Sequence, residues 1–402
     1  MAKPKKIKRT KNIYKSRSTG KIVIKTIIFL FFLMALVFLG YIVSKEWSAR
    51  VLKSQSSSDV LSELSSSTSD LEQSSDYSSE ITSNQEVDAF VDIGDMNAKY
   101  IDSSTLLTMT YTDLELLAKQ LKEEGYKAVC IELKDEKGNI YYSTENKLAR
   151  EISAVVSENT LLNLLAPFKA NNMFTIVSIN TLKDAIAPHA SRNNSYVYGN
   201  NPDITWWDDN MENGGKPWLN PYLQDTRQYI IDIVKEIANC KIDEKSFVDM
   251  IMLEGFEIPC KFTSKMNALQ ETAPTAYKND VLGMLYKDLQ MAAGNIPVTV
   301  SYSFDNTFSS ANPPECKNVL QSNIENIALF IDYKTITDKR QNAIKSLGLD
   351  ENSTVDDVVK AIIDVAIPEN RNKFFLMFNK EDRERANKTI SEYYKIIDTI
   401  IK

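Results

Sequence analysis

The sequence predicts an α/β protein whose folded part is a (β/α)8 barrel of the TIM type, and three observations support this. From Val87 to Lys402, short β-rich runs alternate with amphipathic helical patterns, as in a parallel sheet covered by helices. A length of about 300 residues suits one such barrel. Acidic residues follow nearly every strand-like run, at the strand ends that carry function in barrels. We expect irregularity in the C-terminal half, where the pattern is weaker.

Seven runs have the composition of strands, and an eighth strand has two candidate positions. These positions are the poorly patterned region between Thr335 and Asn372 and the run Tyr100–Met109. The seven runs are Ala89–Ile93, Ala128–Leu133, Phe174–Ile179, Val248–Leu253, Val298–Tyr302, Ile327–Ile331 and Phe374–Phe378.

Helix signals separate these runs. Thr112 followed by Glu115 predicts a capping box, and Gly125 predicts the end of that helix. Asn220 before Pro221 predicts the start of another helix, with Asn220 as its N-cap. The other predicted helices are Tyr277–Ala293, Val355–Ile367 and Lys380–Lys402.

The N-terminal part predicts a membrane anchor. Residues 1–25 contain ten lysines and arginines and no acid, and residues 26–43 form an unbroken apolar run long enough to cross a bilayer as one helix. Because basic flanks stay inside, we expect residues 1–25 to be a cytoplasmic tail and residues 26–43 a single transmembrane helix in the cytoplasmic membrane. A cleaved signal peptide is the rival interpretation, but Trp47 lies where a small residue would be needed.

The region that follows predicts an extracellular domain on a stalk. Residues 44–86 are rich in serine and cannot bury enough apolar surface to fold, so we expect a disordered stalk. Residues 87–402 then form the extracellular barrel domain.

Composition excludes several classes of function. The net charge is −7 for the chain and about −17 once the ten N-terminal cations are set aside, which argues against a nucleic-acid partner. A single histidine excludes a multi-histidine metal site, and no phosphate-binding or calcium loop is present, so neither a metal nor a cofactor is predicted. Four cysteines are too few for a disulfide scaffold, although a Cys240–Cys260 bridge stays open. The sequence makes no prediction about an oligomer.

Two glutamates are the candidate acid/base pair. Glu254 follows the fourth strand-like run and Glu132 lies near the end of the second, so a barrel would bring both to one mouth. Two facing carboxylates are the minimal apparatus of glycoside hydrolysis. Lys134 and Asp135 are expected in support, because strand alternation places Lys134 on the same face as Glu132. The alternative is that Lys134 pairs with Glu132 or Glu254 and only fills the barrel centre.

Other residues are candidates for substrate contact. Trp206, Trp207 and Trp218 lie in one long loop after the third strand-like run, and flat indoles suit the apolar faces of sugars. The alternative is that these tryptophans only pin the loop. The remaining candidates are polar residues at or beyond strand ends: Asn180, Glu257, Asp305 and Asp332.

Five segments resemble a known family in their order and spacing. They are Ala128–Asp135, Leu182–Asp184, Pro202-Asp203, Trp218–Tyr222 and Leu253–Pro259. Over roughly Thr110 to Pro259 the chain is similar to the putative glycosyl hydrolase domain of bacterial proteins of unknown function, which is related to α-amylase-like barrels. The chain has Ser178 where the family usually has arginine, Asn220 where it has aspartate, and Glu254-Gly255-Phe256-Glu257 where it has Asp-Tyr-x-Arg. The resemblance implies a barrel and glycoside hydrolysis, and the two missing arginines weaken the second implication.

The predicted function follows from the anchor, the carboxylates and the resemblance together. We expect a membrane-anchored extracellular glycoside hydrolase-like protein that acts on or near cell-wall or surface polysaccharide by carboxylate acid/base chemistry. The alternative is a catalytically inactive barrel that binds a glycan or a partner protein at the cell surface.

Overall fold

The computed structural model describes residues 97–259, 266–303, 322–366, 374–379, 381–382, 384–386 and 398–401. The chain divides into residues 1–84 and 85–402, and the described residues all belong to the second unit. The predicted tail (1–25), span (26–43) and stalk (44–86) lie outside the described residues. Within the part that is described, no helix has the length and apolar character needed to cross a membrane.

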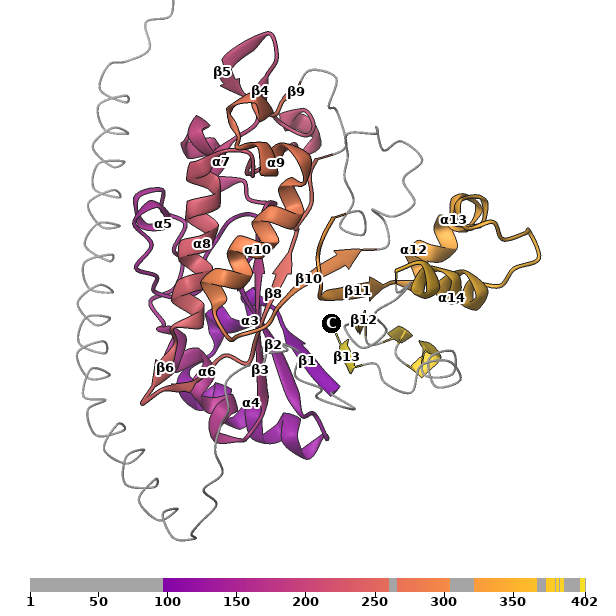
Figure 1. Cartoon of the computed structure of the whole chain (residues 1–402). Helices are drawn as coiled ribbons and strands as arrows, with labels where there is room; N and C mark the ends of the chain where they lie inside the picture. Colours follow the sequence, from indigo (N-terminus) through magenta and orange to yellow (C-terminus); the bar gives the residue numbers. More distant parts are fainter. Residues whose placement is uncertain are drawn as a thin grey trace, which may run out of the picture. The chain divides into compact units, whose positions relative to one another are not determined.

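Eight parallel strands close into a barrel in the order β1, β2, β3, β8, β10, β11, β12, β13 (Figure 1). Each strand pairs with its two neighbours in parallel, and β13 pairs with both β12 and β1. The strands are β1 Asn97–Ile101, β2 Ala128–Lys134, β3 Phe174–Asn180, β8 Met250–Glu254, β10 Val298–Ser303, β11 Ile327–Ile331, β12 Phe374–Phe378 and β13 Asp398–Ile401. The predicted parallel α/β fold of TIM-like type is confirmed.

Six of the seven predicted strand runs are barrel strands, and the two strands where the chain closes differ from prediction. Ala89–Ile93 lies outside the described residues, and the first described strand is β1, which overlaps the start of the candidate run Tyr100–Met109. The predicted helix Lys380–Lys402 is wrong at its end, where β13 forms. Short apolar runs do not reveal their type by periodicity alone, and here pairing with β1 and β12 decides it.

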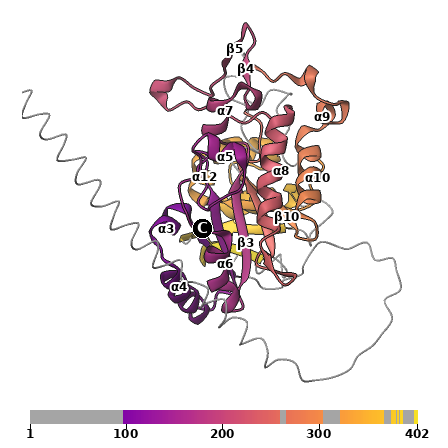
Figure 2. The same cartoon turned by 90° about the vertical axis from the view of Figure 1, so that its left-hand side faces the viewer.

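Helices cover the outside of the barrel (Figure 2). Helix α8 packs against α10, and α4 packs against α6. Between Tyr333 and Ala366 the described residues form helices instead of the candidate eighth strand. The helices are α3 Ser103–Thr108, α4 Tyr111–Glu123, α5 Lys147–Glu151, α6 Leu161–Ala170, α7 Ile186–Ala190, α8 Gln224–Ala238, α9 Thr275–Asn279, α10 Val281–Ala293, α12 Tyr333–Asp338, α13 Arg340–Leu347 and α14 Val355–Ala366.

Two helix starts differ from prediction by two to three residues. The capping box of α4 joins Thr110 and Asp113 and not Thr112 and Glu115, because the Thr110 hydroxyl accepts from Asp113 N and the Asp113 carboxylate accepts from Thr110 N. Helix α8 begins at Gln224, and Asn220 is not its N-cap. The Asn220 side chain instead accepts from Tyr222 N (3.1 Å) and donates to Ala268 O (2.9 Å), so it ties two loops together.

The side chains divide between two cores according to strand alternation. Apolar residues on the outer strand faces pack under the helices in one large cluster. The barrel interior holds a second cluster, composed mainly of alanine and methionine side chains: Ala98, Tyr100, Ala128, Cys130, Ile176, Met250, Met252, Ala328 and Met377. Polar side chains such as Glu254 follow these residues on the same strand faces.

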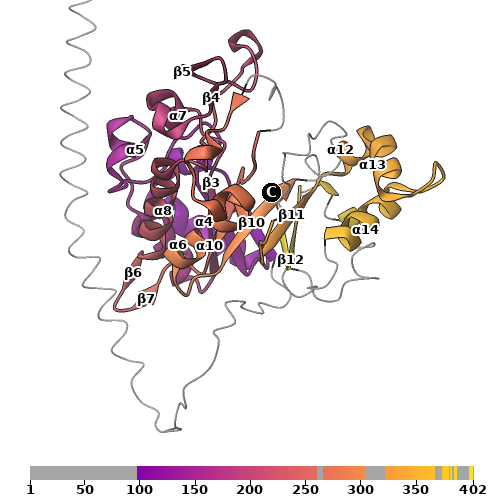
Figure 3. The ribbon, with the colours of Figure 1, turned by 45° about the horizontal axis from the view of Figure 1, so that its top comes forward.

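Two long loops build a small lobe beyond the carboxyl ends of β3 and β8 (Figure 3). A three-stranded antiparallel sheet in the order β5, β4, β9 joins the loop after β3 to the loop after β8. Its strands are β4 Val197–Tyr198, β5 Asn201–Thr205 and β9 Met266–Asn267. A separate hairpin, β6 Lys241–Ile242 with β7 Lys245–Ser246, follows α8. Cys240, just before it, carries a free thiol, so the candidate bridge to Cys260 is not formed.

Candidate active site

Glu254 ends strand β8 with its carboxylate inside the barrel, where it is 8% exposed. Its Oε1 accepts a hydrogen bond from the Tyr100 hydroxyl at 2.6 Å and another from Ser178 Oγ at 2.7 Å. Ser178 is on β3, beside β8, whereas Tyr100 is on β1, two strands further around the ring. The barrel interior therefore brings Tyr100 to Glu254 across 154 positions of sequence.

Glu132 enters the same interior from β2, and its side chain is half-buried. Its Oε2 accepts from the backbone N–H of Ser103 at 3.0 Å and from Ser103 Oγ at 2.6 Å. Ser103 is the first residue of α3, so the turn after β1 holds this carboxylate.

Two tyrosines connect the carboxylates. Burial, followed by the negative charges of Glu254, Cys130 and Glu132, raises the pKa of Tyr100 above its usual range. Tyr141 donates to Asp135 Oδ2 at 2.9 Å, and burial together with the charges of Asp135 and Glu132 raises the pKa of its phenol. Glu132 thus lies within electrostatic range of both tyrosines. Glu254, Glu132 and Asp135, three of the four predicted catalytic residues, are therefore grouped around Tyr100 and Tyr141, and we call this group the polar network.

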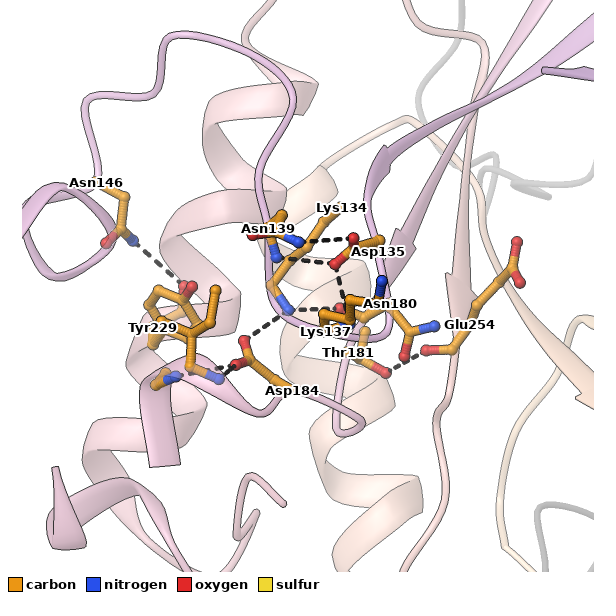
Figure 4. Close-up of polar contacts among 12 residues, drawn as sticks. Lys134, Asp135, Lys137, Asn139, Asn146, Asn180, Thr181, Asp184, Tyr229 and Glu254 are labelled. Atoms are coloured by element: carbon orange, nitrogen blue, oxygen red, sulfur yellow. Dashed lines mark hydrogen bonds and ion pairs between the residues drawn. The ribbon is translucent and has the colours of Figure 1, made fainter. Parts of the chain in front are cut away.

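Asp135 mainly supports a turn (Figure 4). Its Oδ1 accepts from the backbone N–H groups of Lys137 and Asn139, each at 2.9 Å. Its Oδ2 accepts from Asn139 Nδ2 and from the Tyr141 hydroxyl. With both oxygens used in this way, Asp135 shapes the loop at the mouth and positions Tyr141.

Lys134 does not join the two glutamates, and both ion pairs considered for it are wrong. Its Nζ lies 2.7 Å from Asp184 Oδ2 and donates to Asn180 O at 2.9 Å. The reason is a register irregularity between Glu132 and Lys134, which breaks the alternation on which the prediction relied. The Glu254 carboxylate points away from the Lys134–Asp184 pair (Figure 4).

Asp184 is an important buried residue that the sequence reasoning did not assign. Besides pairing with Lys134, its Oδ1 accepts from the N–H groups of Ile186 and Ala187, each at 2.9 Å, at the start of α7. A Cβ at Gly138, which has φ +99°, would lie 2.3 Å from Asp184 Oδ1. The only sequence signal was its place in the Leu182–Asp184 segment of the family resemblance.

The three tryptophans of the long loop have different surroundings. Trp206 is 1% exposed and packs edge-on against Tyr196, with ring centroids 6.1 Å apart, so its ring is not available to a sugar. Trp207 is half-buried and meets His189 edge-on at 5.9 Å. Trp218 is also half-buried and donates from Nε1 to Asp208 at 2.8 Å. Trp206 therefore pins the loop, and two tryptophans remain as candidate sugar contacts.

The other predicted contact residues have mixed positions. Asn180 pairs in register with Glu254 and lies against Gly255, where a Cβ would come within 2.1 Å of its Oδ1. Glu257 forms an ion pair with Lys183, whose Nζ also lies 5.4 Å from the Trp218 ring centroid. Asp332 is the N-cap of α12, and it accepts from Thr335 Oγ1 at 2.8 Å. Asp305 lies outside the described residues.

The described residues contain no cluster of three or more histidine, cysteine or acidic side chains that could hold a metal ion.

A sequence profile identifies the family of the chain. The family described as putative glycosyl hydrolase domain matches residues 100–333, more than half of the 402 residues. The chain belongs to this family. The matched range contains Tyr100, Glu132 and Glu254, so the polar network lies within the glycosyl hydrolase domain and the similarity extends beyond the span expected from the quoted segments.

Solved structures give weaker likenesses. A hypothetical protein from Ruminiclostridium thermocellum is 18% identical with a TM-score of 0.41, over 50% of this chain and 95% of that one. The exo-β-N-acetylglucosaminidase of Vibrio harveyi is 11% identical with a TM-score of 0.41, over 71% of this chain and 41% of that enzyme. A maltogenic α-amylase from Thermotoga neapolitana is 8% identical with a TM-score of 0.43, over 78% and 68%. This chain spans less than half the length of the Vibrio harveyi enzyme.

At these identities the likeness concerns the general fold alone. No curated protein matches the chain.

Proposed function

We propose that this protein is a membrane-anchored extracellular glycoside hydrolase that cleaves cell-wall or surface polysaccharide with Glu254 and Glu132. The observation that carries the proposal is that both carboxylates enter the barrel interior, where Glu254 accepts a hydrogen bond from the Tyr100 hydroxyl and the charge of Glu132 also raises the pKa of that phenol. They come from β8 and β2, on either side of β3, and membership of the glycosyl hydrolase domain family supports the reaction class.

Two carboxyl groups are sufficient for this chemistry. One carboxylic acid gives its proton to the glycosidic oxygen as the bond from that oxygen to C1 breaks. The other, as a carboxylate, either removes a proton from a water molecule that attacks C1, or attacks C1 itself and forms a glycosyl ester, which water then hydrolyses with the first residue taking up the water's proton. Trp207 and Trp218, both half-buried in the long loop after β3, would pack on the apolar faces of the sugar rings.

The proposed location follows from the N-terminal sequence. The basic tail keeps residues 1–25 inside, the apolar run of residues 26–43 spans the membrane once, and residues 87–402 lie outside on the serine-rich stalk. A stalk of about forty residues reaches roughly 35 Å when it is a flexible coil, which limits the substrate to polymer close to the membrane.

The test is release of reducing ends from isolated cell-wall polysaccharide by the full chain. We expect Glu254→Gln and Glu132→Gln each to reduce the rate at least about 100-fold, since each removes a proton-transfer or nucleophilic group. Glu158→Gln, at an exposed glutamate away from the network, is the matched control and should keep the parental rate. The proposal fails if the parent releases no reducing ends or if Glu254→Gln is as active as the parent.

A second candidate function is glycan binding without hydrolysis. The observation in its favour is that Glu254 is only 8% exposed, while Ser178 occupies a position where the family usually has arginine. This candidate predicts that the parent sediments with wall polysaccharide, that Trp207→Ala weakens this binding, and that no reducing ends are released by either protein.

A further inference from the structure

The backbone carbonyl of Glu254 accepts two hydrogen bonds from one residue. Thr181, the first residue after β3, donates to this oxygen from its backbone N–H at 2.8 Å and from its Oγ1 at 2.8 Å. A carbonyl in a parallel sheet receives one donor from the neighbouring strand, and here a side chain supplies a partner for the second lone pair. Thr181 is 1% exposed, so water does not replace either bond. The backbone of Glu254 is therefore fixed by two donors.

The residue after Glu254 continues this contact. Gly255 has φ +58°, and its carbonyl accepts from Leu182 N at 3.3 Å. A Cβ at Gly255 would lie 2.1 Å from Asn180 Oδ1. Glycine suits this position because it adopts a left-handed conformation and has no side chain to keep the two segments apart. We call residues 180–183 the clamp segment, because they hold the chain at Glu254 and Gly255.

The clamp segment is held in turn by the buried ion pair. Lys134 Nζ donates to Asn180 O at 2.9 Å, at the start of the segment, and lies 2.7 Å from Asp184 Oδ2, just after its end. Figure 4 shows the contacts that lead from Lys134 through Asn180 and Thr181 to the carbonyl oxygen of Glu254. One ammonium group therefore fixes both ends of the clamp segment, so the segment has little freedom to move away from Glu254.

The opposite end of the same strand contains a matching contact. Thr175, at the amino end of β3, is 0% exposed, and its Oγ1 donates to Phe247 O at 2.6 Å in the chain that leads into β8. Thr175 and Thr181 thus connect β3 with the same neighbouring part of the chain by the same kind of bond. Only Thr181 lies at the carboxyl end of the strands, where Glu254 is located. A comparison of the two threonines can therefore separate a role in stability from a role at the site.

We infer that Thr181 is a positioning residue for Glu254. Its two bonds fix the backbone at the end of β8, and the side chain that extends from this backbone then reaches Tyr100 and Ser178. A reacting group must be held accurately, since a displacement of about 1 Å can cost about 100-fold in rate. The inference rests on the proposed function and adds to it the residue that holds Glu254 in place.

The first test compares the two threonines in the full chain. Thr181→Val keeps the shape of the side chain and removes the Oγ1 donor, and we expect kcat for the release of reducing ends to fall about tenfold with KM within about twofold of the parent. Thr181→Ser keeps the hydroxyl and should restore most of the rate. Thr175→Val is the matched control: it also loses a buried donor and some stability towards urea, but it should keep the parental kcat.

The second test needs no substrate. Hydrogen exchange followed by NMR reports how often single backbone N–H groups open. We expect Thr181→Val to lower the protection of the amides of residues 181 and 182, which donate to Glu254 O and Gly255 O, about fivefold relative to the other amides of β3. Thr175→Val should not lower the protection of these two amides selectively.

The outcomes separate the inference from the proposed function. If Thr181→Val keeps the parental kcat, or if Thr175→Val loses kcat to the same extent, the positioning role is overturned although the hydrolase function stands. Unchanged protection at residues 181 and 182 in Thr181→Val overturns it as well. If the parent releases no reducing ends, the proposed function fails and the role of Thr181 in catalysis fails with it, whereas the exchange experiment still decides whether Thr181 holds the backbone of Glu254.

Discussion

Two polar clusters lie near the carboxyl ends of neighbouring strands, and they use their charges differently. In one, Glu254 and Glu132 accept hydrogen bonds from hydroxyl and N–H groups. In the other, Lys134 and Asp184 pair at 2.7 Å and are 2% and 0% exposed. Hydroxyl donors hold a carboxylate in place without cancelling its charge, whereas a buried lysine cancels the charge of the carboxylate that it pairs with. The glutamate cluster can therefore take part in acid/base chemistry, and the Lys134–Asp184 pair stabilises the fold.

The largest expected effect comes from breaking the buried ion pair. Lys134→Met leaves the Asp184 carboxylate buried without its cation, and we expect a loss of about 3–5 kcal/mol in the free energy of unfolding, measured with urea. The double variant Lys134→Met with Asp184→Asn removes both charges and should recover a large part of that loss. Equal losses in the single and double variants would show that the two residues act independently.

A smaller effect is expected at the glycine beside the pair. Gly138→Ala places a methyl group within 2.3 Å of Asp184 Oδ1 at a positive φ, and should cost about 1–3 kcal/mol of stability. Gly125→Ala is the matched control, because Gly125 also has a positive φ (+87°) but no atom within 4 Å of the added Cβ. The difference between the two variants in thermal unfolding measures the collision with Asp184 alone; no difference would mean that Asp184 moves aside.

The smallest expected effect is a pH dependence of the free energy of unfolding, and it comes from Tyr229, whose phenol is within electrostatic range of Asp184. Burial, followed by the charges of Asp184 and Tyr142, holds the pKa of Tyr229 well above its ordinary value near 10. The folded state keeps this proton where the unfolded chain releases it, so the contribution is complete below about pH 10 and falls as the pH rises further. Tyr229→Phe should reduce the loss of stability above pH 10 by up to about 1.4 kcal/mol per pH unit.

The measurement is urea unfolding between pH 8 and pH 11, within the range where the chain stays folded. Because the Tyr229 hydroxyl has no hydrogen-bond partner in the described residues, its removal should leave stability at pH 8 nearly unchanged. Parallel slopes for Tyr229→Phe and the parent protein would contradict the prediction.

The outer features of the fold could be predicted from local pattern. Runs such as Ala128–Leu133 and Phe174–Ile179 are buried on both faces, and their continuous apolar character is typical of parallel barrel strands. The Ile230 to Ile237 stripe of α8 is buried as helical periodicity requires. The closing strand β13 was not predicted, because four residues that look helical in isolation gain their partners only when the ring closes.

The positions of the two candidate carboxylates could be predicted from the sequence, whereas their hydrogen-bond partners could not. Glu132 and Glu254 were expected at one mouth because acids follow parallel strands, and both do enter the barrel interior. Tyr100 was missed because its segment was not expected to be the first strand, and Trp206 was misjudged because nothing local distinguishes a buried indole from an exposed one. The prediction that Lys134 shares a strand face with Glu132 was wrong for a specific reason. One register irregularity between the two residues reverses the face that simple alternation assigns to Lys134.

By itself, the sequence determined the class of fold, the family, and the placement of Glu132 and Glu254 near the ends of two strands. Hydrophobic patterns and acids that follow strands are properties of neighbouring residues, so they can be recognised without the tertiary structure. Tertiary structure alone decided that Tyr100 and Ser178 meet on one oxygen of Glu254, that Ser103 holds Glu132, and that Lys134 turns to Asp184. Those contacts join residues 29 to 154 positions apart, and only strand register and barrel closure bring such residues within hydrogen-bonding distance.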